Sequence, residues 1–99
     1  MSRRKGEITP RRIDRDFPHQ VELPAAMVVG ANGLLADAVA KALASVAPRH
    51  NSAHRDGEFF IRYAFADPAD AETFYARFGG LRLTTGFRRG RYFYEYAPD

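Results

Sequence analysis

The side chains in this chain that are best suited to binding chemistry are arginines and aromatic rings. Arginine presents a planar fork of donors that fits phosphate or carboxylate oxygens, and an aromatic ring can stack on a base or be buried by a protein partner. These residue types predict a binding surface. The candidate protein contacts are Phe60, Arg62, Tyr92, Tyr94 and Tyr96. The candidate nucleic-acid contacts are Arg3, Arg4, Lys5, Arg11, Arg12, Phe60, Arg62, Arg82, Arg88, Arg89 and Arg91.

Signals for catalysis, metal binding and cofactor binding are weaker. The chain has no cysteine, which excludes disulfides and thiolate chemistry and fits a reducing cytoplasm. His50 and His54 are four residues apart, but Pro48 disfavours the helix that would bring both to one metal ion. Gly30 and Gly33 resemble a phosphate-binding turn, yet the further strand–helix units of a dinucleotide-binding domain are missing. We therefore expect a non-enzymatic domain without a metal or a cofactor.

Charge divides the chain near residue 16. Residues 1–16 hold six basic and three acidic side chains, a net charge of +3 that equals the formal charge of the whole chain. The large apolar residues of this segment are Met1, Ile8 and Ile13, too few to repay the entropy of ordering it. The pattern predicts that residues 1–16 form a mobile basic arm and that residues 17–99 form a single domain.

Residues 59–68 predict a strand that leads directly into a helix. Alternation along 59–65 places Phe60 and Arg62 on one face and Phe59, Ile61, Tyr63 and Phe65 on the other. Asp67 can cap the helix and Pro68 fits its first turn, where a missing N–H costs nothing. The expected apolar stripe of this helix consists of Ala71, Phe74, Tyr75 and Phe78, and Gly79 is expected to end it.

The other expected elements follow from periodicity and turn residues. Asp56-Gly57 favours a two-residue turn, which makes residues 49–54 a weak strand. Apolar residues at three- and four-residue spacing predict a helix over 33–47, with Leu34 and Leu35 on its buried face and Pro48 after its end. Strands are also expected at 19–23, between Pro18 and Pro24, at 81–83 and at 91–96, with a turn bounded by Gly86 and Gly90.

In order, these elements predict an α+β, two-layer sandwich, ferredoxin-like βαββαβ with an additional C-terminal strand. The alternative is a less regular two-layer α+β domain without the 49–54 strand. Two helices would cover one face of an antiparallel sheet and leave the other face open to solvent or to a partner.

Several segments resemble a family of short bacterial hypothetical proteins with no assigned activity. The resemblance rests on residues 1–9 (MSRRKGEIT), on 17–24 (FPHQVELP) and on 65–80, from FADP through DAE to RFGG. It implies that this chain shares the unknown function of that family. The segment 88–96 departs from the family pattern.

A second, partial resemblance is to the RNA-recognition motif. Alignment on Phe65 and on the helix after it puts Phe60 and Arg62 at the outward positions that stack on bases in that motif. Phe59 and Ile61 replace the two glycines of the motif, and the first expected strand offers no outward aromatic residue.

Two functions remain open. The first is a binding or assembly domain that forms a homodimer or holds a protein partner through the open sheet face and the aromatic strand 91–96. The alternative is a nucleic-acid-binding domain in which the basic arm and the C-terminal arginines meet phosphates. The longest apolar region, 25–46, is interrupted by Asn32, Asp37 and Lys41, so we expect no membrane segment and a cytoplasmic location.

Overall fold

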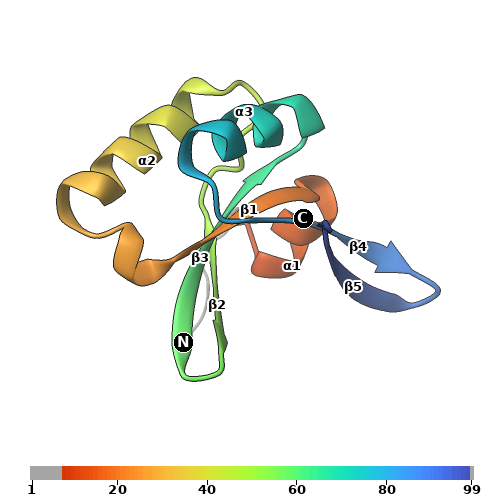
Figure 1. Cartoon of the computed structure of the whole chain (residues 1–99). Coiled ribbons are helices and arrows are strands. Elements are labelled where there is room, and N and C mark those ends of the chain that lie inside the picture. Colours follow the sequence, from red (N-terminus) through yellow and green to blue (C-terminus); the bar gives the residue numbers. More distant parts are fainter. Residues whose placement is uncertain (1–7, 99) are drawn as a thin grey trace.

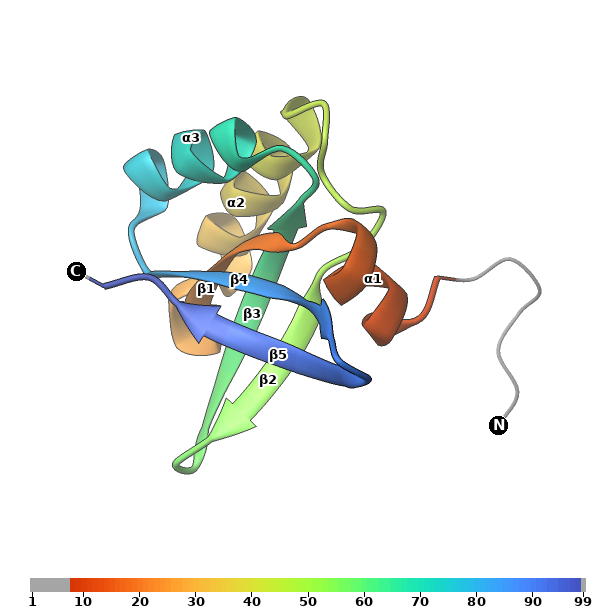
Figure 2. The ribbon, with the colours of Figure 1, turned by 90° about the vertical axis from the view of Figure 1, so that its right-hand side faces the viewer.

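The computed structural model describes residues 8–98, which form three α-helices, one short 3-10 helix and five strands. The sheet has the order β2-β3-β1-β4-β5, and each pair of neighbours is antiparallel. Figures 1 and 2 show α2 and α3 side by side on one face of the sheet and α1 on the opposite side. In chain order the elements are α1 (Pro10–Asp16), β1 (His19–Pro24), η1 (Ala25–Met27), α2 (Gly30–Ala42), β2 (Asn51–Arg55), β3 (Glu58–Phe65), α3 (Pro68–Phe78), β4 (Leu81–Arg88) and β5 (Arg91–Tyr96).

The predicted ferredoxin-like two-layer sandwich is wrong. The five strands curl into an antiparallel half-barrel, with α2 and α3 on its convex side and α1 against its concave side (Figure 2). We expected the second face of the sheet to be open. That face carries Gln20 and Glu22, both buried, and curvature brings side chains from the outer strands over them. The α+β class is confirmed.

Residues 8–16 are part of the domain, which corrects the prediction of a separate arm for this stretch. Helix α1 begins with Thr9, whose side-chain oxygen accepts a hydrogen bond from the Arg12 N–H at 3.1 Å. Ile13 is completely buried against Ala47 and Ala64. Ile8 and Phe17 pack against the same cluster, so α1 docks on partners that come from distant parts of the chain. The remainder of the predicted arm, residues 1–7, lies outside the described residues.

The main core lies between the convex face of the sheet and helix α3. Val21, Leu23, Tyr63 and Phe65 project from β1 and β3 onto Phe74, which is completely buried. The predicted cap of α3 is confirmed, since Asp67 Oδ1 accepts the Ala69 N–H at 2.9 Å. No helix within residues 8–98 is long and apolar enough to cross a membrane.

Helix α2 differs from its predicted form. It spans Gly30–Ala42, and the residues after it return to the sheet, where the Ala47 N–H bonds to the Ala64 carbonyl at 2.8 Å. The small residues Ala36 and Ala40 face the core, while Leu34 is 74% exposed and Leu35 is 45% exposed. The predicted apolar stripe therefore lies partly on the outer side of the helix, because α2 is apolar on more than one face.

The two hairpins of the sheet are tight. Asp56 and Gly57 both have positive φ, which confirms the turn between β2 and β3. Gly86 was expected to bound a turn but lies inside β4. A Cβ atom at this position would lie 2.6 Å from the Phe93 ring. The turn between β4 and β5 is instead at Arg89 and Gly90, which both have positive φ. Phe59, expected on the same face as Ile61, Tyr63 and Phe65, is 61% exposed because it precedes the part of β3 that α3 covers.

Candidate functional site

The concave face of the half-barrel gathers the five residues that were predicted as protein contacts. Strand register puts Arg62 opposite Glu22, Tyr96 opposite Leu83, and Tyr94 opposite Thr85. Side chains that are directly paired across an antiparallel sheet lie on the same face. The structure therefore brings Phe60, Arg62, Tyr92, Tyr94 and Tyr96 to one side of the sheet. Alternation had predicted the shared face of Phe60 and Arg62, whereas strand register adds the three tyrosines.

Glu22 is the centre of a hydrogen-bonded network on this face. Its side chain is 0% exposed, and that of Arg62 is 14% exposed. Arg62 Nε donates to Glu22 Oε2 at 3.0 Å, the Tyr96 hydroxyl donates to the same oxygen at 2.9 Å, and Arg55 donates to Oε1. Burial alone raises the pKa of Glu22, but the three donors outweigh it and hold the pKa below its usual value.

Side chains from the two outer strands of the sheet, β2 and β5, meet above Glu22. Arg55 from β2 donates from Nη1 to the Tyr96 hydroxyl of β5 at 3.0 Å, and its guanidinium lies 4.0 Å from the centre of the Phe60 ring. Arg62 also donates to the Tyr96 hydroxyl, at 3.1 Å. The chain's own side chains thus cover this part of the concave face, which corrects the expectation of an open sheet face.

Helix α1 closes the other end of the concave face through Asp14. The Asp14 carboxylate is buried and accepts bonds from Gln20 Nε2 and from the Tyr94 hydroxyl, each at 3.0 Å. Thr85 donates to the Asp14 carbonyl at 2.6 Å. Burial first, and then the bond to Asp14, raise the pKa of Tyr94. Beside this contact a pocket of about 270 Å³ is lined by Pro10, Asp14, Asn51, Ser52, Arg62 and Tyr94, among others, and offers donors and acceptors for a small polar group or water.

Sequence reasoning missed Glu22, Arg55 and Asp14. Glu22 had a signal: it lies between Val21 and Leu23 on a strand that proves to be central, and a carboxylate on the second face of a central strand needs partners. Arg55 and Asp14 had none, because their roles depend on the curvature of the sheet and on the docking of α1.

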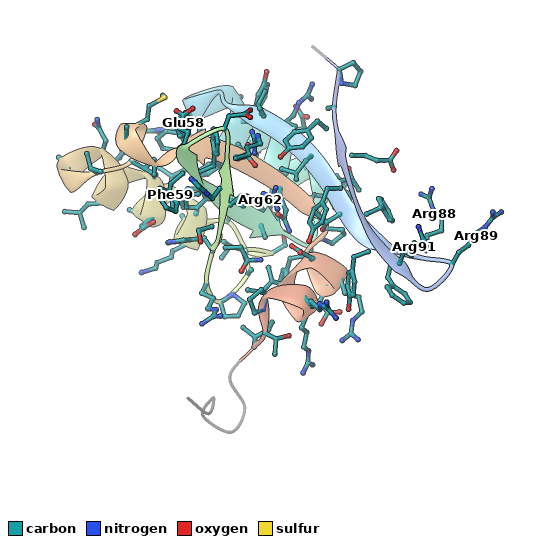
Figure 3. All side chains as sticks on the ribbon, turned by 90° about the horizontal axis from the view of Figure 1, so that it is seen from below. Glu58, Phe59, Arg62, Arg88, Arg89 and Arg91 are labelled. Carbon is teal, nitrogen blue, oxygen red and sulfur yellow. The ribbon has the colours of Figure 1, made fainter. Side chains whose placement is uncertain are left out.

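The predicted cluster of C-terminal arginines is divided by the structure. Arg82 lies on the opposite face, where it pairs with Glu72 of α3 and stacks on the Tyr75 ring at 4.6 Å. Figure 3 shows Arg88, Arg89 and Arg91 together at the end of the β4–β5 hairpin, apart from Arg62.

Helix α1 adds further arginines beside this hairpin. Arg11, Arg12 and Arg15 are exposed, and the Arg11 guanidinium lies 5.2 Å from the centre of the Tyr92 ring. We call Arg11, Arg12, Arg15, Arg88, Arg89 and Arg91 the arginine surface. Its neighbouring acids are Asp16, which bonds to Arg12 and Arg15, and Glu95, which is 3.8 Å from Arg88. Arg3, Arg4 and Lys5 lie outside the described residues.

The two histidines that were considered as metal ligands each lie beside an aromatic ring. The His54 ring stacks on Phe59 at 4.4 Å, and the His50 ring lies 5.2 Å from Tyr63. Among residues 8–98, no group of three or more histidine and acidic side chains could hold a metal ion. The chain matches no protein-family model, no curated protein and no solved structure. The two resemblances drawn from the sequence therefore stay predictions, and the following proposals depend on the geometry alone.

Proposed function

We propose that this protein is a non-enzymatic binding domain that holds single-stranded nucleic acid on the arginine surface. The observation that carries the proposal is the presence of six exposed arginines on two neighbouring elements, α1 and the β4–β5 hairpin, where Arg11 lies against the Tyr92 ring. Within residues 8–98, the acids paired with these arginines are Asp16 and Glu95. Phosphate contacts supply most of the non-specific affinity for nucleic acids, and arginine can fork onto phosphate oxygens.

Aromatic rings within the arginine surface favour a single strand over a duplex. Phe87 is exposed, and its ring meets that of Tyr92 edge-on at 4.9 Å, beside Arg11. Rings of this kind can stack on bases that have left a duplex, worth about 1–3 kcal/mol per base. Arg62, predicted as a further contact, is held by Glu22 and Tyr96 instead, so we leave it out of the proposed interface.

Salt dependence of binding tests this proposal. A fluorescent single-stranded oligonucleotide should bind with an affinity that falls steeply as salt rises, because each neutralised phosphate releases counterions. For single strands each contact contributes about 0.7 to the slope of log affinity against log salt, so the Arg88→Ala, Arg89→Ala double variant should lower the slope by about 1.4. Arg77→Ala is the control, since Arg77 is exposed on α3, outside the arginine surface. Absence of binding at low salt, or an equal loss in the control, would refute the proposal.

A protein contact through the concave aromatics is the second candidate function. The observation in its favour is that Tyr94 and Tyr96 are each more than a third exposed on the outer strand β5, although their hydroxyls are engaged. An association that weakens in Tyr94→Ala, and that changes little with salt, would support this function over nucleic-acid binding.

A further inference from the structure

Helix α2 carries apolar side chains on two opposite faces. Ala36 and Ala40 face the core and are buried. Leu34 and Leu35 project outward, and three alanines on the same outer side are also exposed: Ala31, Ala38 and Ala42. The spacing of these five residues is i, i+3, i+4, i+7 and i+11, which forms one continuous stripe along a helix. A helix that is apolar on both faces is normally covered on both, so the outer stripe of α2 is suited to a partner.

The apolar surface continues beyond the helix. From Pro24 to Ala36 the sequence contains no charged residue. Met27 and Val29 are both more than half exposed in the segment that leads into α2. An apolar groove of about 170 Å³ adjoins the stripe and is lined by Leu23, Met27, Val28, Asn32, Leu35 and Phe78. Contiguous exposed patches of this kind on soluble domains commonly mark interaction sites.

We propose that the partner is a second copy of this chain, packed through α2 against α2. Charge complementarity favours a second copy. Asp37 and Lys41 lie on one flank of the stripe, and in a two-fold antiparallel helix pair the same flanks face each other. If the pair is centred near Val39, each Asp37 faces the Lys41 of the other copy, which gives two ion pairs beside the apolar stripe. Asp37 has an oxygen for this contact, because only its Oδ1 accepts the Tyr63 hydroxyl, at 3.2 Å.

Two features separate this surface from the proposed function. Figure 1 shows α2 at the side of the molecule away from the β4–β5 hairpin, so a dimer would leave the arginine surface of both copies uncovered. The stripe also lacks the rim of several basic side chains that an anionic membrane would attract, since Lys41 is the sole cation of α2. The inference is therefore independent of nucleic-acid binding.

Sedimentation equilibrium of the full chain across micromolar concentrations tests the proposal. The wild type should dimerise, and Leu34→Ser should weaken the dimer at least about tenfold, because Leu34 is the most exposed leucine of the stripe. Leu81→Ser is the matched control, an exposed leucine on β4 outside the stripe. Lys41→Glu should also weaken the dimer, and Asp37→Lys added to it should restore part of the affinity.

Circular dichroism melts establish that each variant is folded before its association is compared. A wild type that stays monomeric at all concentrations would refute the proposal. So would a dimer that Leu34→Ser and Leu81→Ser weaken equally, since the contact would then lie elsewhere. Binding of a monomeric wild type to phosphatidylcholine vesicles, lost in Leu34→Ser, would assign the stripe to a lipid surface and overturn the dimer.

Discussion

Replacing Glu22 with alanine should destabilise the domain strongly, because it leaves Arg62 charged and almost enclosed. The Arg62 side chain is 14% exposed, and Glu22 is its carboxylate partner. Removing one member of a buried ion pair typically costs about 3–5 kcal/mol. Arg55 contributes less to this cost, since its side chain is 36% exposed and water can solvate it. For a domain of this size the loss corresponds to a fall in melting temperature of more than about 12 °C.

Urea unfolding followed by circular dichroism measures the effect, and an unchanged slope would show that the compactness of the native state is kept. Glu72→Ala is the control, because Glu72 pairs with Arg82 at the surface, where a pair contributes about 0–1 kcal/mol. A Glu22→Ala cost no larger than that of Glu72→Ala would refute the closed network of the concave face. The double variant Glu22→Leu, Arg62→Met should recover part of the loss, since neither charge then remains buried.

The same carboxylate should make stability depend on pH. The pKa of Glu22 is lower in the folded protein than its usual value near 4.5. The unfolded state therefore binds more protons than the native state between the two pKa values, so the contribution is complete above about pH 4.5 and is lost as the pH falls through the folded pKa. Glu22→Gln should be less stable at neutral pH and should lose less stability on acidification. A wild-type profile parallel to that of Glu22→Gln would contradict this role.

Four further substitutions test the packing. Phe74→Ala should cost about 3–5 kcal/mol because the ring is completely buried, whereas Phe59→Ala should cost less than about 0.5 kcal/mol; urea titrations compare the two. Ile13→Ala should cost about 2–5 kcal/mol in the same assay, and a neutral result would mean that α1 is not docked on the sheet. Burial, followed by the proximity of Asp37, raises the pKa of Tyr63 to about 12, so a spectrophotometric titration should show a late tyrosine step that vanishes in Tyr63→Phe. That variant should lose about 1 kcal/mol, the usual value of one hydrogen bond.

Local chemistry made several elements of the fold predictable. The Asp67 cap, Pro68 in the first turn and Gly79 at the end of α3 depend on bonds within a few residues, and all three are confirmed. The Asp56-Gly57 turn is equally local, because both residues adopt the positive φ that this turn requires. Alternation along β3 also placed Phe60 and Arg62 on one face, since the side chains of a strand point to alternate sides regardless of the curvature of the sheet.

The sequence alone determined the α+β class, the principal strands, helix α3 and the shared face of Phe60 and Arg62, because each depends on near neighbours in the chain. Tertiary structure decided the curling of the sheet into a half-barrel, the docking of α1 and the outward orientation of the Leu34 side chain. It also decided the composition of the concave face, where Glu22 meets Arg55, 33 residues later, and Tyr96, 74 residues later. Such contacts depend on how far the sheet curls. The curled sheet buries polar groups, and the free-energy cost of that burial is offset by hydrogen bonds from side chains that are distant in the sequence.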